Sequence, residues 1–555
     1  MKVAMAQIDP KVGDLEGNIR IITEYIENAK KRHADLVVFP ELSVTGYPPQ
    51  DLLLETDFVK QNKELLKDLI SRNKSIAGVI GFVDRAGTSL YNAAAVFVGS
   101  EIVDVIYKTL LPTYDVFDED RYFETRGGKQ VKPVSVNIAD IQIKLGVEIC
   151  EDLWDEAYDV KVTDLLARSA SDIIVNISAS PFYVGKRLER ERLLKKKART
   201  NGIPIFYVNM VGGQDELVFD GQSLAVDSSG DLIALGKRFE EDLIVVEIDL
   251  NRRLGEKVEP PAYSEEEEMF DAIVLGIRDY FRKTGFKKTI VGLSGGIDSS
   301  LTVCLACEAL GKENVIGASM SSKFSSDQSK TDARQLAENL DICFVQFPIQ
   351  DIVNAYQETM HQPLQEIRNH FELGTGADNA VADENIQPRV RGNCLMDISN
   401  RLKELRILVL NTGNKTELAL GYCTLYGDMA GGIGVLGDVS KLEVYRLAEY
   451  VNKKTGREII PKSVFSKKPS PELTEDQFDP FDFDIVSPLV DEVVENRRSK
   501  SELVAMGYPE AVVEDVCGRI RIAEYKRWQA PPCIKITRKA FGIGRKMPIV
   551  NGYRG

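Results

Sequence analysis

Residues 290–310, IVGLSGGIDSSLTVCLACEAL, combine the features of an anion-binding turn. Residues 289–293 are β-branched or apolar without polar alternation, which predicts a short buried strand. A Ser-Gly-Gly turn follows, and apolar residues at helical spacing predict a helix from about Ser299. A helix N-terminus offers free backbone N–H groups and the positive end of the helix dipole, so this turn is expected to bind a phosphate.

The side chains around this turn limit the kinds of ligand that it can bind. Ser294 and Ser299 add hydroxyl donors, whereas Asp298 suits a phosphate only if a divalent cation lies between the two anions. The spacing matches neither G-x-G-x-x-G nor G-x-x-x-x-G-K-[ST], because no lysine follows the glycines. SGGIDSS resembles instead the pyrophosphate loop of ATP pyrophosphatases, which cleave ATP between its α and β phosphates. The plain alternative is a glycine turn in an ordinary α/β domain.

A second group of reactive side chains lies in the first half of the chain. Glu41, Lys108 and Cys150 each directly follow an expected strand, in DLVVFPE, IVDVIYK and IKLGVEIC. A thiol with an ordinary pKa of about 8.5 is mostly protonated at neutral pH, so it needs a base or a cation to act as a nucleophile. None of the three histidines has a suitable setting, which leaves a carboxylate base with a lysine. Taken singly, each of these residues also has an ordinary structural explanation.

The sequence segments around these three residues resemble those of a known protein family. FPELSVTGYPPQDLL, YKTLLPTYDVFDEDRYF and GVEICEDLW resemble, in order, the Glu-Lys-Cys signatures of the nitrilase superfamily, and more narrowly those of the glutamine-dependent NAD synthetase family. The resemblance implies Glu41 as general base, Cys150 as nucleophile and Lys108 as stabiliser of the oxyanion. It further implies a supporting carboxylate at Glu119, and a glutamine pocket formed by Tyr114, Glu151, Ser180 and Lys186 with Trp154 beside them.

The second half of the chain resembles the synthetase domain of the same family. SGGIDSS, ENIQPRVRGN, TGNKTELALGYCTLYGDMAGG, SPELTEDQFDP and EYKRWQAPPCIKITRKAFGIGR match its successive motifs. The resemblance implies ATP binding by Gly292, Leu293, Ser294, Gly295, Gly296, Ile297, Asp298, Ser299, Thr412 and Lys441. It implies Mg²⁺ at Asp298 and Glu417, and deamido-NAD at Asn385, Glu417 and Lys526, with Arg389 and Arg391 as phosphate partners. Glu417 therefore matches both a metal and a substrate position, and the sequence does not separate them.

The expected elements place these residues in two domains. Residues 1–250 alternate strands and helices in strand-rich pairs, which favours a layered α/β sandwich of the nitrilase-like αββα type. Residues 251–268 are charged and proline-interrupted, and are expected to be a linker. Residues 269–555 predict a Rossmann-like parallel α/β domain with ligands at the strand C-termini. Within it we expect a helix over 327–340 capped by Ser325 or Asp327, a helix over 393–402, and long loops over 366–383 and 463–484.

The composition limits the classes of function. The 555 residues carry a net charge of −15 with a pI of about 5.1, which argues against nucleic acid as the main partner. No apolar signal region or transmembrane run is visible, so no membrane partner is expected. Eight cysteines in mostly apolar segments indicate reduced thiols and a cytoplasmic location. The C-x-x-C of Cys304 and Cys307 is expected to pack in the core rather than to bind zinc.

Together the two halves predict one reaction. Cys150 forms a glutamyl thioester and releases ammonia, water activated by Glu41 hydrolyses the thioester, and the ammonia attacks deamido-NAD that ATP has adenylated. We expect the ammonia to pass through the protein, in a homo-oligomer that binds small-molecule substrates. Three alternatives remain: another amidotransferase of the pyrophosphatase group, a nitrilase-type amidohydrolase fused to a nucleotide-binding module, and an inactive nucleotide-sensing protein. The Glu-Lys-Cys segments disfavour the first, and intact Cys150 and Asp298 disfavour the last.

Overall fold

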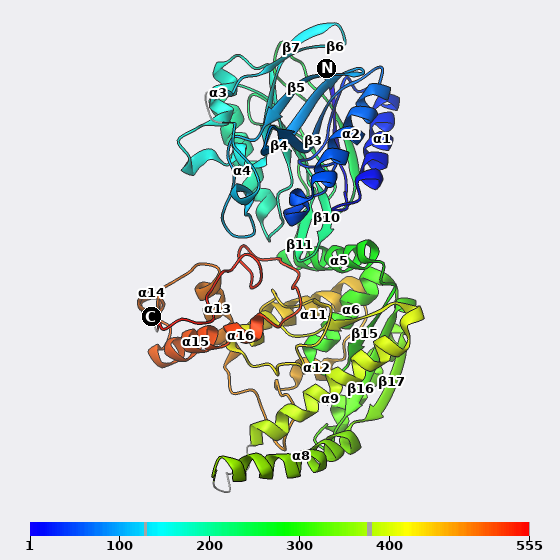
Figure 1. The fold of residues 1–555 in the computed structure, drawn as a ribbon, viewed down its shortest axis with the longest axis vertical. Coiled ribbons are helices and arrows are strands. Elements are labelled where there is room, and N and C mark those ends of the chain that lie inside the picture. The colour runs from blue at the N-terminus through cyan, green and yellow to red at the C-terminus, as the bar shows by residue number, and fades with distance from the viewer. Residues whose placement is uncertain (127–129, 374–379, 554–555) are drawn as a thin grey trace. The chain divides into compact units, whose positions relative to one another are not determined.

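The computed structural model describes residues 1–126, 130–373 and 380–553 (Figure 1). The chain divides into two units, Met1–Tyr263 and Ser264–Gly555, here named unit 1 and unit 2. Each unit has its own sheets and its own buried apolar core.

Unit 1 contains two six-stranded sheets and a hairpin. The first sheet has the order β14-β1-β2-β3-β4-β5, with β1, β2 and β3 parallel. The second has the order β13-β12-β9-β8-β7-β6, with β7, β8 and β9 parallel. The strands are β1 (Lys2–Gln7), β2 (Leu36–Val38), β3 (Ala77–Ala86), β4 (Ser89–Val98), β5 (Glu101–Tyr107), β6 (Val134–Ile138), β7 (Ile141–Ile149), β8 (Ile173–Ser178), β9 (Ile205–Asn209), β10 (Val211–Gln214), β11 (Leu217–Asp220), β12 (Leu224–Val226), β13 (Leu232–Leu235) and β14 (Asp242–Glu247).

Three of the buried apolar clusters of unit 1 form the layers of its fold. One cluster lies between the two sheets and includes Val38 of β2 and Val147 of β7. A second lies between the first sheet and helices α1 and α2, and a third between the second sheet and helices α3 and α4 (Figure 1). The predicted αββα sandwich is therefore confirmed. The helices are α1 (Leu15–Lys31), α2 (Thr56–Arg72), α3 (Val162–Arg168) and α4 (Lys186–Asn201).

Unit 2 is built on a five-stranded parallel sheet with the order β17-β16-β15-β18-β19. Helices α8 and α9 pack Val353 and Leu395 against Ile290 of the sheet, and α10, α13, α14 and α15 bury a separate apolar cluster. This confirms the predicted parallel α/β arrangement. The elements are α5 (Glu265–Thr284), β15 (Lys288–Gly292), α6 (Ile297–Leu310), β16 (Val315–Ser321), α7 (Asp327–Leu340), β17 (Cys343–Pro348), α8 (Gln350–His370), α9 (Ala380–Arg401), β18 (Ile407–Asn411), α10 (Lys415–Leu420), β19 (Ile433–Gly434), α11 (Lys441–Thr455), α12 (Lys462–Ser466), α13 (Phe483–Val494), α14 (Lys500–Ala505), α15 (Glu510–Ile522) and α16 (Glu524–Arg527).

Two long helices of unit 2 differ from the prediction. α9 starts well before the predicted helix at 393–402, and no helix is predicted where α8 lies. Each contains an internal proline, Pro363 or Pro388, and proline normally interrupts a helix. The predicted loop over 366–383 is correspondingly shorter, because its ends belong to α8 and α9. Its residues 374–379 lie outside the described part of the chain.

The helix starts near the expected anion site are also shifted. α6 begins at Ile297 rather than near Ser299. α7 has Ser326 as its N-cap, with its hydroxyl oxygen accepting from the Ser329 N–H at 3.2 Å, rather than Ser325 or Asp327. These shifts of one or two residues leave the polar side chains at the same end of the sheet.

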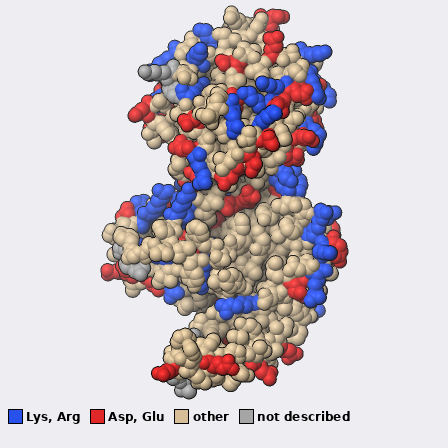
Figure 2. Space-filling model, viewed as in Figure 1, with Lys and Arg blue, Asp and Glu red and all other residues tan. Residues whose placement is uncertain are grey.

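On the face of the molecule that Figure 2 shows, the charged side chains of unit 1 are not segregated by sign. Figure 2 shows Lys and Arg interspersed with Asp and Glu over unit 1. Among the helices that the structure describes, none combines the length and the apolar character needed to cross a bilayer.

Candidate active sites

The first candidate site lies where β2, β5 and β7 end in unit 1. The Lys108 ammonium lies 2.7 Å from Glu41 Oε1 and 2.8 Å from Glu119 Oε1, and all three side chains are buried. The other oxygen of Glu41 accepts from the Ala179 N–H at 3.0 Å. The structure therefore brings the predicted base, lysine and supporting carboxylate into direct contact.

Cys150 occupies the turn that follows β7. Its φ of 44° lies in the left-handed region, which non-glycine residues rarely adopt and which often marks a functional turn. Burial raises the pKa of the Cys150 thiol well above its ordinary value, and the Glu41 carboxylate adds to this while Lys108 opposes it. The resting thiol is thus protonated, so an adjacent base is needed to activate it.

Lys108 is cationic despite its burial. Desolvation by itself would lower the pKa of Lys108, but the carboxylates of Glu119 and Glu41 outweigh it and raise the pKa above its ordinary value. Burial raises the pKa of Glu119 to about 7, with Lys108 acting in the opposite direction. A buried ammonium held between two carboxylates is suited to stabilise a developing oxyanion.

Two side chains that the sequence did not single out support this cluster. Asn92 Nδ2 donates to Glu41 Oε1 at 2.7 Å, and the Tyr47 hydroxyl donates to Glu119 Oε1 at 3.0 Å. Asn92 is a buried polar residue directly before the apolar run AAAVFV of β4, which is a signal that could have identified it. Nothing in the sequence around Tyr47 distinguishes it from a core aromatic residue.

The residues predicted to bind glutamine make three separate groups of contacts. The Tyr114 hydroxyl donates to Glu151 Oε2 at 3.0 Å, and Tyr158, which was not predicted, donates to Glu151 Oε1 at 3.0 Å. The Lys186 ammonium lies 3.6 Å from the centre of the Trp154 ring. The buried Ser180, adjacent to the Ala179 amide that contacts Glu41, donates its own N–H to Asn209 Oδ1 at 2.9 Å.

Glu148 of β7 supports a prediction about stability. It is fully buried, and Asn176 Nδ2 contacts both its carboxylate at 3.3 Å and the Cys150 carbonyl oxygen at 3.4 Å. Burial raises the pKa of Glu148 from 4.5 to about 7. Because the folded chain then binds a proton more tightly than the unfolded chain, this group lowers the free energy of unfolding as pH rises from about 4.5 to about 7.

We expect Glu148→Gln to remove that loss of stability. The free energy of unfolding of the variant relative to the parent should increase between pH 5 and pH 8, by up to about 3 kcal/mol. Urea unfolding at several pH values measures the difference, with the exposed Glu247→Gln as control. Parallel pH curves for Glu148→Gln and the parent would contradict the prediction.

The second candidate site is a cavity of about 310 Å³ in unit 2, at the ends of β15, β16 and β18. Every residue predicted to bind ATP lines it except Gly295. Gly295 has a φ of 76°, and a Cβ there would lie 2.3 Å from the Ser329 carbonyl oxygen, so the turn requires glycine where it packs on α7. The residues predicted for ATP that line the cavity are Gly292, Leu293, Ser294, Gly296, Ile297, Asp298, Ser299, Thr412 and Lys441.

Three charged side chains meet in this cavity. The Lys441 ammonium lies 2.6 Å from Asp298 Oδ2 and 3.2 Å from Glu417 Oε1. Burial alone would lower the pKa of Lys441, but Asp298 and Glu417 raise it above its ordinary value. Burial in turn raises the pKa of Glu417 to about 7 despite the neighbouring ammonium. Asn414 orients the pair, because Nδ2 donates to Asp298 Oδ1 at 2.8 Å and Oδ1 accepts from the Glu417 N–H at 3.0 Å.

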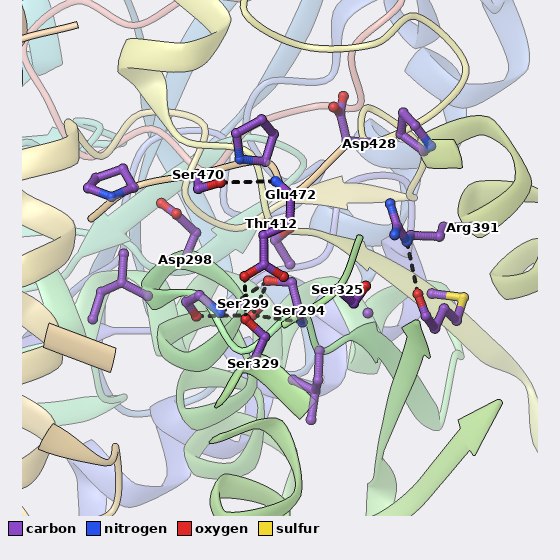
Figure 3. Close-up of a pocket in the computed structure, with 18 of the residues that line it drawn as sticks. Ser294, Asp298, Ser299, Ser325, Ser329, Arg391, Thr412, Asp428, Ser470 and Glu472 are labelled. Carbon is purple, nitrogen blue, oxygen red and sulfur yellow. Dashed lines mark hydrogen bonds between the residues drawn. The ribbon is translucent and has the colours of Figure 1, made fainter. Parts of the chain in front are cut away.

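The predicted long loop contributes to the same cavity. Residues 467–482 contain no helix or strand, and several of them line it. Glu472 accepts from Ser329 Oγ at 2.7 Å and from Ser326 Oγ at 2.9 Å, and Figure 3 shows its carboxylate directed at Ser329 beside Ser294 and Ser299. Glu472 lies in the quoted motif SPELTEDQFDP but was not among the residues predicted for the site.

The residues predicted to contact deamido-NAD lie in part behind the cavity. Glu417 and Arg391 line it, and Figure 3 shows Arg391 donating to a backbone oxygen, that of Met320, at 3.0 Å. Asn385 accepts from Thr424 Oγ1 at 2.7 Å, and Lys526 donates to the carbonyls of Gly421 and Cys423 at 2.8 and 2.7 Å. Arg389 likewise donates to the Leu425 carbonyl at 3.2 Å. These three thus hold the segment that leads to Gly427 and Asp428 of the cavity wall.

Comparison with known proteins covers both units. A family model described as carbon-nitrogen hydrolase matches residues 2–253, and one described as NAD synthase matches residues 269–530. The glutamine-dependent NAD(+) synthetase of Thermotoga maritima is 40% identical over 100% of this chain and 99% of its own. That of Synechocystis is 41% identical over 99% of each chain. The chain belongs to the glutamine-dependent NAD(+) synthetases.

Solved structures agree with this assignment. The glutamine-dependent NAD+ synthetase of Acinetobacter baumannii, in complex with ADP, is 36% identical and superposes with a TM-score of 0.77 over 99% of this chain and 98% of its own. That of Cytophaga hutchinsonii has the same fold, with 21% identity and a TM-score of 0.83 over 99% of this chain and 98% of its own. As a member of the glutamine-dependent NAD(+) synthetases, the chain is a ligase with a nitrilase-like unit 1 and an NAD synthase unit 2.

Proposed function

We propose that this protein converts deamido-NAD to NAD, using glutamine as the nitrogen donor and cleaving ATP to AMP and pyrophosphate. The observation that carries the proposal is that each unit contains its own reactive cluster: Glu41, Lys108 and Cys150 in unit 1, and Asp298, Glu417 and Lys441 around the cavity of unit 2. Similarity to glutamine-dependent NAD(+) synthetases over the full chain length supports joining the two chemistries in one reaction.

In unit 1, the proposed chemistry is glutamine hydrolysis. Glu41 accepts the Cys150 proton as sulfur attacks the side-chain amide carbon of glutamine, and the Lys108 ammonium stabilises the tetrahedral oxyanion. Glu41 returns the proton to the departing nitrogen, so ammonia leaves and a glutamyl thioester remains on Cys150. Water activated by Glu41 then hydrolyses the thioester to glutamate and free thiol. Glu119 maintains the position of Lys108 through its 2.8 Å contact.

We assign recognition of glutamine to charged and polar residues near this cluster. We assign the Glu151 carboxylate to the α-ammonium group of glutamine, because it directly follows Cys150 and accepts from the Tyr114 and Tyr158 hydroxyls. We assign Lys186, which lies beside Trp154 and 3.7 Å from Glu189, to the α-carboxylate. Ser180 supports this pocket from the same segment that contacts Glu41.

In unit 2, the proposed chemistry is activation of a carboxylate. The nicotinate carboxylate of deamido-NAD attacks the α-phosphorus of ATP, and pyrophosphate leaves to the Ser-Gly-Gly turn and the N-terminus of α6. Ammonia then attacks the acyl adenylate and displaces AMP. Lys441 lies at the strand ends with its ammonium directed into the cavity, where it neutralises phosphate charge.

The residues present suit a magnesium ion. Asp298 and Glu417 both reach the same ammonium nitrogen, so their oxygens converge on one region. Among the described residues there is no cluster of three or more ligating side chains, and Mg²⁺ in phosphate-transfer sites typically uses one or two carboxylates together with substrate phosphates. Asp298 and Glu417 would hold the ion, which when bound supplies charge neutralisation at the leaving pyrophosphate. The same convergence leaves Glu417 able to contact substrate.

We further propose that ammonia reaches unit 2 through protein and that the chain forms a homo-oligomer in the cytoplasm. All eight cysteines are free, which supports a reducing compartment. The apolar stripe of α8 supports self-association, because Ile352, Tyr356, Leu364 and Ile367 at helical spacing are about half exposed. Light scattering of the purified chain gives the mass in solution, and a monomer at all concentrations would contradict the oligomer.

A reconstituted assay tests the function. With ATP, Mg²⁺, deamido-NAD and glutamine, we expect NAD, AMP and pyrophosphate in equal amounts, together with at least as much glutamate. Formation of ADP and phosphate, or of no NAD, would refute the proposal. The alternative of an amidohydrolase fused to a nucleotide-binding module predicts amide hydrolysis that needs neither ATP nor deamido-NAD.

A further inference from the structure

Asp152 connects the two strand ends that carry the catalytic lysine and cysteine. Its Oδ1 accepts from the backbone N–H groups of Thr109 and Leu110 at 3.0 and 2.8 Å, immediately after Lys108. Its Oδ2 accepts from the Ile149 N–H at 3.1 Å, immediately before Cys150. The side chain is fully buried, so none of these three bonds competes with water.

The two strand ends joined in this way belong to different sheets. Lys108 follows β5 at the edge of the first sheet, whereas Cys150 follows β7 in the second. In the part of the chain that the structure describes, no β-ladder pairs the two sheets, and the layer between them is mainly apolar, with a few polar links such as that from the Ala179 N–H to Glu41. Apolar packing is less directional than hydrogen bonding. The Asp152 carboxylate accepts hydrogen bonds at the end of β5 and at the end of β7, and it therefore holds Lys108 and Cys150 at a better-defined distance than apolar packing would.

The same carboxylate fixes the conformation of the nucleophile. Cys150 has a φ of 44°, and the bond from the Ile149 N–H to Asp152 closes the turn around it. Arg126 is the neighbouring cation, and its Nε donates to Thr109 Oγ1 at 3.2 Å, which anchors the Lys108 side of the contact. Asp152 itself does not touch Cys150 Sγ, Lys108 Nζ or Glu41 in any contact that the described residues show.

We propose that Asp152 is a positioning residue for glutamine hydrolysis, which sets the Cys150 thiol against the Lys108 ammonium by bridging the two sheets. This inference rests on the proposed glutaminase function of unit 1. Small displacements of a reacting group reduce catalysis steeply, since about 1 Å can cost about a hundredfold in rate. The effect should fall on the chemical step rather than on glutamine binding.

Asp152→Asn in the full-length chain is the test. Asparagine keeps one acceptor for Thr109 and Leu110, but its amide places a donor against the Ile149 N–H. We expect kcat for glutamine hydrolysis to fall about ten- to a hundredfold, with KM for glutamine changed less than threefold. NAD synthesis from ammonia should stay within twofold of the parent. Alkylation of Cys150 by iodoacetamide, followed on its tryptic peptide by mass spectrometry, should slow in the same proportion as kcat.

Asp155→Asn is the matched control. Asp155 is equally buried in the next turn, and its carboxylate pairs with Lys197 at 2.5 Å without bridging the catalytic strand ends. It should keep parental kcat and alkylation rate. Equal losses in both variants, a parental kcat in Asp152→Asn, or a parental alkylation rate with reduced kcat would each overturn the positioning role. If the parent itself makes NAD from ammonia but hydrolyses no glutamine, the proposed function of unit 1 fails instead.

Discussion

Replacing Cys150 with alanine is expected to abolish glutamine-driven NAD synthesis and to leave ammonia-driven synthesis intact. Removing a nucleophile typically costs on the order of 10³-fold or more in turnover, because no other group can form the covalent intermediate. Cys150 is the sole cysteine of unit 1, so no neighbouring thiol can substitute for it. The described residues that line the cavity belong to unit 2, so its chemistry should continue when ammonia is supplied.

The measurement is NAD formed per minute with either glutamine or ammonium chloride as nitrogen source. Cys343→Ala, which changes an exposed thiol on β17, serves as control and should retain both activities. If Cys150→Ala also loses ammonia-driven synthesis while remaining folded, the division into two sites is wrong. If it keeps glutamine-driven synthesis, the nucleophile has been misassigned.

Replacing Asp298 with alanine is expected to have the opposite effect. NAD synthesis from both nitrogen sources should fall about 10²- to 10³-fold, because the cavity loses the carboxylate that holds Lys441 at 2.6 Å and that we assign to the metal. Basal glutamine hydrolysis at Cys150 should persist. The readouts are NAD and pyrophosphate for unit 2 and glutamate for unit 1.

Asp327→Ala provides the control for this variant. Asp327 lies in the first turn of α7, and its almost fully exposed carboxylate pairs only weakly with Lys330 at 3.1 Å. It should retain both activities within twofold. Loss of glutamine hydrolysis together with NAD synthesis in Asp298→Ala would show misfolding or an obligatory coupling between the two reactions.

The sequence indicated the reactive residues because chemistry constrains residue type at strand ends. Glu41, Lys108 and Cys150 lie far apart in the chain, yet each follows a recognisable strand. β2 and β5 belong to the first sheet and β7 to the second, so the packing of one sheet on the other brings these strand ends together. The Ser-Gly-Gly turn was recognisable for a similar reason, since a strand, a glycine turn and a helix N-terminus form a local unit. The fold class followed from the alternation of strands and helices.

The residues that the sequence missed act through contacts that are distant in the chain. Asn92 and Tyr47 contact Glu41 and Glu119 only after the first sheet has formed. Asp152 was visible beside Cys150, but its bonds to Thr109 and Leu110 depend on how two sheets face one another. The bounds of α8 and the first part of α9 were not predicted; each of these segments contains a proline that local propensity penalises and that the folded chain tolerates.

By itself, therefore, the sequence indicated candidate reactive residues and a local turn suited to an anion. Local spacing encodes strands, helix starts and glycine turns, and these need no distant partner. Only the tertiary structure showed which distant residues complete the site around SGGIDSS. Lys441 and Asn414 contact Asp298, and residues 467–482 help to line the cavity. Those contacts join residues more than one hundred positions apart, and such contacts form only when the sheet orders its strands. The anion turn is local, but the site around it is a product of the fold.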